Sequence, residues 1–260
     1  MVLVPVSVRP PAAGRVNTAP IKWAAELPHV REVSLRGTAD LAFWNERLAR
    51  EGHSPAEQNG RAQVLIIAAD GRFRGIRFRE LSFSVIVTPP DEGSATRDAA
   101  FLVRAFNSNR FFAFCERTFF STPYDHGHVR VSTSAPASVE LSLKGRTVFA
   151  AQMGAAPREP ARVGADGWEG PVFLPGKAAG NASALRFFVA RIRGETRAYP
   201  FEAAVDSLAI TPSGELDLFA ALAASRFMAE EWSIRPDAWH AKSKTSRYFL
   251  TARPGDDVVR

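Results

Sequence analysis

The sequence lacks most of the features that identify a protein's chemistry at sight. It has one cysteine, Cys115, which excludes an internal disulfide framework and a thiolate zinc cluster and suits a reducing cytoplasm. No apolar run is long enough to cross a bilayer. The P-loop, the G-x-G-x-x-G fingerprint and the G-x-S-x-G elbow are also missing, so ATP, dinucleotide and serine-hydrolase chemistry have no support.

Lysine is scarce as well, since only five of the 33 basic residues are lysine. The net charge of +6 and the isoelectric point of about 10 raise the question of nucleic-acid binding. The arginines, however, alternate with acidic residues and form no basic tract. We therefore expect a solvated arginine-rich surface with no nucleic-acid or membrane partner, and a bias toward small anionic molecules.

What the sequence does contain is enough for one large folded unit. A chain of 260 residues can bury roughly three quarters of its unfolded surface, so it needs no covalent staples. Prolines interrupt the apolar start and no basic region precedes it, so we expect residues 1–27 to be an N-terminal arm rather than a signal peptide. Residues 28–260 are expected to form a single domain.

Hydrophobic periodicity predicts many strands, few helices and no alternation of strand and helix. This pattern favours an α+β fold that is mainly an antiparallel barrel or cone with peripheral helices. The expected strands are 30–37, 62–69, 73–87 after an Asp70-Gly71 turn, 111–133 broken at Ser-Thr-Pro, 138–153 around a Lys144-Gly145 turn, 184–194 and 203–212. The expected helices are 38–52, with Thr38 or Asp40 as its cap, and 215–231. Residues 99–109 are left open between a helix and a strand-helix mixture. Residues 154–171 are expected to be a surface loop, and the tail from 232 is expected to be irregular.

The stretch 113-AFCERTFFSTPYDHGHVRVST-133 gathers more reactive side chains than any other. Cys115 has aromatic neighbours, which indicates a buried and inert thiol. His126 and His128 are two apart, so in a strand both imidazoles share a face and Asp125 points away. No second histidine pair completes a metal site, so we expect a surface or pocket-lining pair and no metal.

Glu80 lies in 76-IRFRELSFSVIV-87, where alternation places it on one face with Phe78, Ser82 and Ser84. One interpretation is a solvent-facing or salt-bridged carboxylate. The other is a carboxylate that points into a barrel, where burial raises its pKa and makes it available for acid–base chemistry. The residues alone leave both open.

Four segments follow one another in an order that is known from one family: 30-VREVSLRGTAD-40, 62-AQVLIIAADG-71, 78-FRELSFSVIV-87 and 114-FCERTFFSTPYDHG-127. Over roughly residues 28 to 250 this layout resembles the acetoacetate decarboxylase-like superfamily. There an early strand carries an arginine, two strands carry glutamates, and a Gly-Arg-Glu segment runs into a Tyr-Pro-Lys-Lys turn. The resemblance implies that superfamily's β-cone, a double-psi-like barrel with a few peripheral helices.

Position by position, the resemblance places Arg31 where the family has a pocket arginine and Glu80 where it has a pocket glutamate. Arg117 matches the arginine of the Gly-Arg-Glu segment, Pro123 matches the turn proline, and Leu65 replaces the other glutamate. Tyr124 and Asp125 replace the two lysines of the turn. A tyrosine cannot form an imine and an aspartate favours a charged amine, so the resemblance implies a member without Schiff-base decarboxylase activity.

Two functions are therefore expected from the sequence. The first is a lyase-, isomerase- or hydrolase-type enzyme on a small oxo-acid, without a cofactor. Its catalytic residues would be Glu80, Tyr124, Asp125 and His126, and its substrate-binding residues Arg31, Arg117 and His128. The alternative is a non-catalytic ligand-binding or structural protein on the same fold. In both cases we expect a cytoplasmic protein, and self-association into a homo-oligomer is left open.

Overall fold

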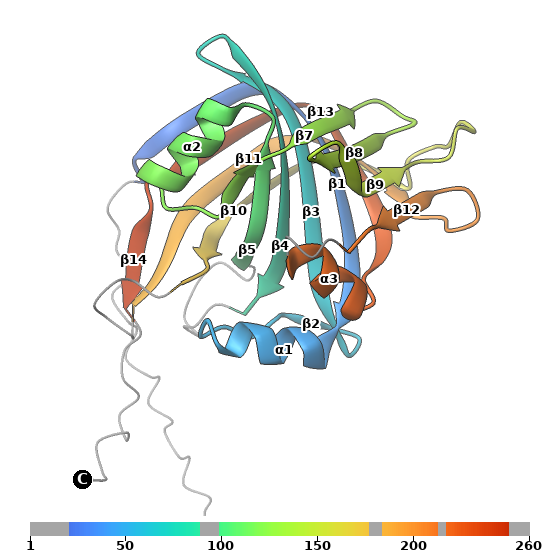
Figure 1. The fold of residues 1–260 in the computed structure, drawn as a ribbon. Coiled ribbons are helices and arrows are strands. Elements are labelled where there is room, and N and C mark those ends of the chain that lie inside the picture. The colour runs from blue at the N-terminus through green and yellow to red at the C-terminus, as the bar shows by residue number, and fades with distance from the viewer. Residues whose placement is uncertain (1–20, 89–98, 177–183, 213–216, 250–260) are drawn as a thin grey trace, which may run out of the picture.

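The computed structural model describes residues 21–88, 99–176, 184–212 and 217–249, and most of the predicted arm lies outside them. Its largest sheet is closed, because β1 pairs with β13 on one side and with β3 on the other (Figure 1). Within the closed ring, neighbouring strands are antiparallel except for a short parallel contact between β5 and β10. In order around the ring the strands are β1 (Trp23–Asp40), β13 (Met228–Ser243), β11 (Ala184–Pro200), β10 (Arg162–Leu174), β5 (Ala99–Asn107), β4 (Ile76–Val87) and β3 (Arg61–Phe73).

Short strands extend this barrel, and a second sheet lies beside it. The extensions are β2 (Glu57–Gln58) on β3, β6 (Tyr124–His126) on β5 and β14 (Ser246–Phe249) on β11. The second sheet is antiparallel, in the order β12 (Ser207–Ile210), β9 (Arg146–Gln152), β8 (Ser138–Leu143) and β7 (His128–Ser132). The predicted class, a mainly antiparallel α+β barrel with a few peripheral helices, is confirmed.

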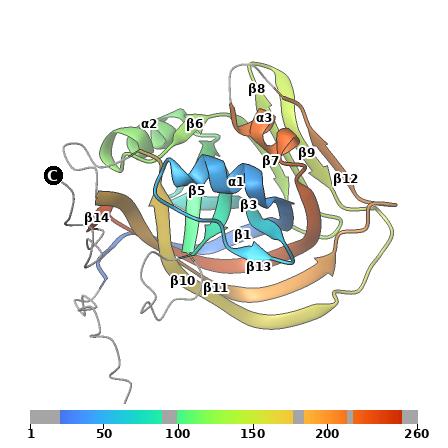
Figure 2. The ribbon, with the colours of Figure 1, turned by 90° about the horizontal axis from the view of Figure 1, so that it is seen from below.

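The described residues form three helices that lie against these sheets: α1 (Leu41–Ala49), α2 (Arg110–Phe119) and α3 (Asp217–Ala224). Seen from below, α1 crosses the near end of the barrel (Figure 2). The predicted cap of this helix is confirmed, because the side chain of Asp40 accepts a hydrogen bond from the Phe43 amide at 2.7 Å. None of the helices within the described ranges has the length and apolarity needed to span a membrane.

Strand β4 separates the hydrophobic core from the interior of the barrel. Its odd-numbered residues pack outward, where Phe83 makes edge-on contacts with Phe149 of the second sheet and Phe219 of α3, at centroid distances of 5.3 and 5.8 Å. Its even-numbered residues, including Glu80, line a cavity inside the barrel. The alternation predicted for this strand is therefore confirmed.

The segment 110–119 forms helix α2, so the prediction of a strand from 111 onward was wrong there. Asn109 caps the helix, because its side-chain oxygen accepts hydrogen bonds from the amides of Phe111 and Phe112 at 3.0 and 3.3 Å. The helix turns one face toward the cavity, made of residues spaced i, i+1, i+4, i+5 and i+8: Phe111, Phe112, Cys115, Glu116 and Phe119. Cys115 is thus half-buried on a helix and not in a strand.

One of the two predicted hairpin turns is correct. Lys144 and Gly145 both have positive φ, 48° and 79°, as a two-residue turn between β8 and β9 requires. The other turn is not Asp70-Gly71 but Arg74-Gly75, with φ of 49° and 83°. Strand β3 continues through Gly71, since a glycine without a left-handed φ does not have to end a strand.

The tail from 232 is regular, contrary to the prediction, because it forms most of β13. Likewise 99–107 is a strand, part of the expected loop 154–171 belongs to β10, and the helix expected over 215–231 covers only 217–224 of the described residues. In β13 polar side chains such as Ser233, Arg235 and His240 line the barrel interior, so the simple alternation of apolar and polar residues is lost.

Candidate active site

The barrel encloses a cavity of about 530 Å³ whose walls come from all seven strands of the ring. Helix α2 contributes one wall, so the cavity is bounded by strands and by a helix. A volume of this size is typical of small-molecule sites. Most of the lining surface is apolar, and the charged side chains among the lining residues come from β1, β4, β11, β13 and α2.

Glu80 and Tyr124 meet in this cavity. The Tyr124 hydroxyl donates a hydrogen bond of 2.6 Å to Oε1 of Glu80. Burial is the main cause that raises the pKa of Glu80, the charge of Glu116 adds to it, and the bond from Tyr124 opposes it. Burial and the same carboxylates raise the pKa of Tyr124 well above 10, so its hydroxyl keeps its proton.

Lys242 enters the same cavity from β13, far in sequence from the turn that carries Tyr124. Its ammonium forms a close ion pair with Glu116 of α2 and lies 5.5 Å from the ring centroid of Tyr124. The rings of Phe120 and Phe188 also face it, at 4.9 and 4.5 Å. Sequence reasoning missed this lysine because it considered only lysines close to the turn in sequence.

The carboxylate of Glu116 is held on two sides. Besides the ammonium of Lys242, it accepts a hydrogen bond of 2.7 Å from the Thr122 hydroxyl, which also donates to the Glu116 carbonyl at 2.9 Å. Thr122 and its neighbours thereby fix the end of α2 against the turn that leads into β6. The pair Lys242–Glu116 consequently has a defined place beside Glu80 and Tyr124.

A second buried carboxylate, Glu32 of β1, lines the cavity and is 0% exposed. One of its oxygens forms a close ion pair with Arg235, and the other lies 2.7 Å from Nε2 of His240. Burial alone would raise the pKa of Glu32, but the contact with His240 and the charge of Arg235 outweigh it and lower the pKa. The two cavity glutamates are therefore shifted in opposite directions.

Strand register places these glutamates at one level of the barrel. Glu32 on β1 pairs with Ala69 on β3, and Ala69 pairs with Glu80 on β4. Neighbouring strands are about 4.8 Å apart, so the two backbones lie about 10 Å apart across two strands. Both side chains point inward from this level, which leaves room between them for a small molecule.

The other predicted catalytic residues lie outside this cavity. Asp125 is engaged by Arg104, whose Nε donates to it at 2.7 Å, and by Arg117 at 3.5 Å. Arg117 is an exposed residue of α2 and does not line the cavity. His126 and His128 are both exposed, on β6 and β7, and do not line it either. The structure therefore brings together only Glu80 and Tyr124 of the predicted set.

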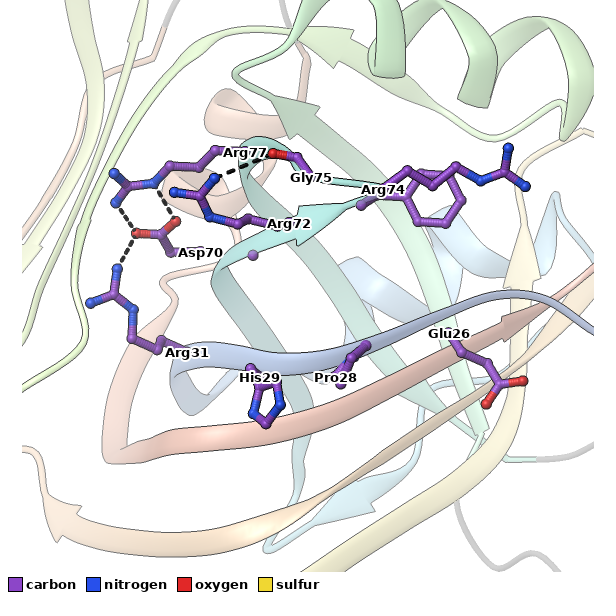
Figure 3. A pocket seen from close by; sticks show the side chains of 11 residues that line it. Glu26, Pro28, His29, Arg31, Asp70, Arg72, Arg74, Gly75 and Arg77 are labelled. Carbon is purple, nitrogen blue, oxygen red and sulfur yellow. Dashed lines mark hydrogen bonds and ion pairs between the residues drawn. The ribbon is translucent and has the colours of Figure 1, made fainter.

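Arg31, predicted to bind substrate, lies in a different pocket of about 610 Å³ near the β3–β4 hairpin (Figure 3). Its Nη2 donates to Asp70 at 2.8 Å, and Arg77 binds the same carboxylate through two hydrogen bonds of 2.9 and 2.6 Å. The bonds from Arg77 are the main cause of the lowered pKa of Asp70. Arg31 thus forms part of an ion-pair cluster rather than of the site around Glu80.

The arginine of β1 that does line the cavity is Arg36, which sequence reasoning passed over. Alternation along β1 sends Glu32, Ser34 and Arg36 inward, whereas Arg31 falls on the other face. Arg36 forms no hydrogen bond or ion pair within the described ranges. A correct strand boundary for β1 would have identified it, since the inward phase follows from the buried Val33 and Leu35 on the opposite face.

Metal ligation finds no support in the part of the chain that the structure describes, where no group of three or more histidine, cysteine or acidic side chains converges. The cavity instead has two carboxylate clusters, each paired with a cationic side chain. One joins Glu116 to Lys242 beside Glu80, and the other joins Glu32 to Arg235. Such an arrangement can hold and move protons and can bind an anion, which are the elements of acid–base chemistry.

Comparison with known proteins identifies similar folds but no related sequence family. No protein-family model matches the chain, and no curated protein does. An acetoacetate decarboxylase-like enzyme from Sphingomonas wittichii RW1 matches with a TM-score of 0.55 at 11% identity, over 91% of this chain and 99% of that one. Acetoacetate decarboxylase from Legionella pneumophila subsp. pneumophila str. Philadelphia 1 matches with 0.59 at 12% identity, over 92% of each chain.

A third solved structure is the enduracididine biosynthesis enzyme MppR, complexed with the condensation product of pyruvate and imidazole 4-carboxaldehyde. It matches with a TM-score of 0.55 at 14% identity, over 93% of this chain and 99% of that one. These three structures are too distant in sequence to carry their activities to this chain. They do confirm the resemblance at the level of structure: this chain has the acetoacetate decarboxylase-like fold.

Proposed function

We propose that the barrel cavity is the active site of an enzyme that acts on a small organic acid or carbonyl compound by acid–base chemistry, without an imine. The observation that carries this proposal is the hydrogen-bonded pair of Glu80 and Tyr124 inside the cavity, beside the ion pair of Lys242 and Glu116. Proton donors in a largely apolar cavity act on substrate more strongly than they would in water.

Glu80 serves as the acid in this scheme. Its raised pKa keeps its proton to a higher pH than that of an ordinary glutamate, and the Tyr124 hydroxyl is a neutral donor beside it. A carbonyl oxygen placed at this pair would receive a hydrogen bond, and a proton as negative charge develops on the oxygen. That is the requirement for enolisation, for elimination and for retro-aldol cleavage.

Arg36 is the residue that we propose for binding a substrate carboxylate, in place of the predicted Arg31 and Arg117. Arg36 is an exposed residue that lines the cavity and is free of ion pairs with the described residues, so its guanidinium can form a two-pronged contact. It lies four residues along β1 from Glu32, a backbone distance of about 13 Å. Even with a long arginine side chain, this spacing favours a substrate larger than a three- or four-carbon acid.

The absence of an imine rests on the charges around Lys242, which among the described lysines is the one that faces the site. Glu116 forms a close ion pair with Lys242, so the nitrogen of this lysine is already engaged by a carboxylate. An amine that attacks a ketone must be neutral, which is obtained by burial or by a neighbouring cation. Together with the replacement of both turn lysines by Tyr124 and Asp125, this contact supports a non-covalent reaction.

The alternative is a protein that binds a small ligand without changing it. Its support is the apolar and aromatic character of most of the cavity lining. A binder needs no proton donor, however. Burial of a carboxyl group with a raised pKa costs stability, and such groups are found mainly at functional sites. We therefore favour the enzyme of lyase, isomerase or hydrolase type.

The test is proton exchange at carbon. Pyruvate, acetoacetate, 2-oxohexanoate and 4-phenyl-2-oxobutyrate are incubated with the protein in D2O, and proton NMR follows deuterium incorporation next to the carbonyl. We expect exchange with at least one of the two larger acids, reduced about 10²-fold or more in Glu80→Gln. Glu46→Gln, on the exposed face of α1, is the matched control and should exchange at the wild-type rate. Binding of these acids without any exchange would favour the binder.

Borohydride trapping tests the claim about the imine separately. Protein incubated with acetoacetate or pyruvate and then reduced should keep its unmodified mass. A reduced adduct mapped to Lys242 would show that the ion pair with Glu116 does not prevent imine formation, and the non-covalent mechanism would be wrong. The cytoplasmic location stays a prediction from composition, and self-association stays open.

A further inference from the structure

The cavity contains a histidine that the scheme above does not use. His240 of β13 lines the cavity, and its Nε2 atom lies 2.7 Å from Oε2 of Glu32. Its Nδ1 atom makes no hydrogen bond with any described residue. One ring nitrogen therefore faces a buried carboxylate, and the other is open to a ligand.

Glu32 can fix the proton of this ring. A carboxylate with a lowered pKa accepts hydrogen bonds, so it favours the tautomer with the proton on Nε2 and leaves the lone pair on Nδ1. The contact meets the distance of an ion pair but not the angle of a linear hydrogen bond. The χ2 torsion of histidine is soft, so the ring can change this angle without a movement of the backbone.

Arg235 holds the carboxylate in turn. It pairs with Glu32 across the β1–β13 ladder and forms a close ion pair with the oxygen that His240 does not contact. A base oriented by a second group that is itself fixed is the arrangement found in hydrolase triads. Because Glu32 and Glu80 share one level of the barrel, this cluster approaches the space in front of the Glu80–Tyr124 pair from another side.

We propose that His240 is the general base of this cavity, that Glu32 is the residue that positions it, and that the substrate is an oxo acid with a hydrogen on the carbon next to its carbonyl. This inference rests on the proposed function and assigns its two proton transfers to two different clusters of side chains. His240 takes protons from carbon, and Glu80 with Tyr124 supplies protons to oxygen.

The step balances as a proton transfer. The Nδ1 lone pair of His240 takes the proton from the carbon, and the C–H electrons form a carbon–carbon double bond. The electrons of the carbonyl double bond move to its oxygen, which takes a proton from the Glu80–Tyr124 pair. In D2O the proton on the imidazolium exchanges with solvent, so that return of a deuteron to carbon gives the labelled acid. No oxidant, reductant or metal takes part.

The experiment removes the imidazole ring of His240 by mutation and then supplies free imidazole in the buffer. His240→Ala should lose exchange with 4-phenyl-2-oxobutyrate by about 10²-fold or more, and imidazole added to the buffer should restore a saturable part of the rate. A residue that only supports the fold would not be rescued in this way. The matched control is His29→Asn, exposed and outside the cavity, at a φ of 59° that asparagine tolerates. It should exchange like the wild type.

The possible results separate the two proposals. Wild-type exchange that survives in His240→Ala, or that imidazole fails to restore, overturns the base and leaves the acid role of Glu80 standing. If the wild-type protein binds the acids but exchanges hydrogen in none of them, the base role of His240 and the acid role of Glu80 are both wrong. Independently of any substrate, ¹⁵N NMR should find the His240 proton on Nε2 in the wild type. A proton found on Nδ1 in the neutral ring would refute the assigned base.

Discussion

The ion pair between Glu32 and Arg235 gives the sharpest prediction about stability. Arg235→Met removes the cation and leaves a carboxylate whose side chain is 0% exposed, with His240 as its remaining partner. Breaking a buried pair from one side costs about 3–5 kcal/mol of unfolding free energy, and the contact with His240 favours the lower end. For a chain of this size about 3 kcal/mol corresponds to a fall of about 6–12 °C in the melting temperature.

The assay is urea unfolding at pH 7, followed by tryptophan fluorescence, of four proteins: wild type, Arg235→Met, Glu32→Leu/Arg235→Met and Arg50→Met. Removing both partners leaves no unpaired charge, so the double variant should recover most of the loss. Arg50→Met breaks only an exposed pair with Glu46 on α1 and should change little. A loss below about 1 kcal/mol in Arg235→Met, or a double variant worse than the single one, would refute the reasoning.

Acidification should weaken the folded state through His53, whose pKa is lowered from 6.5 to about 4 by burial against Phe101 and Phe173. The unfolded chain takes up this proton first, so about 3 kcal/mol is lost as pH falls from 6.5 to 4, and His53→Phe should lack that loss in denaturant titrations at several pH values. Equal slopes in the two proteins would contradict it. Gly37→Ala should cost about 1–3 kcal/mol in the same unfolding assay, because the added Cβ would meet the Met228 carbonyl oxygen at 2.0 Å.

Much of the barrel could be predicted from local patterns. The strand containing Glu80 shows strict alternation, and its inward phase follows from Leu81, Phe83 and Val85 on the other face. The turn at Lys144-Gly145 and the cap at Asp40 have strong local signals, and both are correct. These features are short-range, so one sequence is enough to find them.

The parts of the site that were missed depend on long-range pairing. His240 and Lys242 lie on β13, whose inward residues are mostly polar. The sequence of this strand therefore does not show the alternation of apolar and polar residues from which a strand is predicted. Arg36 is an exception, because the alternation of β1 around the buried Val33 and Leu35 already places it on the inward face and Arg31 on the other. Helix α2 was read as a strand because its aromatic residues are typical of strands, although the Asn109 cap and the i, i+4 spacing of Phe112 and Glu116 indicate a helix.

The central claim is that two glutamates at one level of the barrel are poised for opposite roles. Carboxyl ¹³C NMR of glutamate-labelled protein tests it directly, with Glu32→Gln and Glu80→Gln to assign the two resonances. We predict that Glu80 titrates at a higher pH than an ordinary glutamate and Glu32 at a lower one, since burial dominates for the first and His240 with Arg235 for the second. Two glutamates that titrate together, or in the reverse order, would contradict the account.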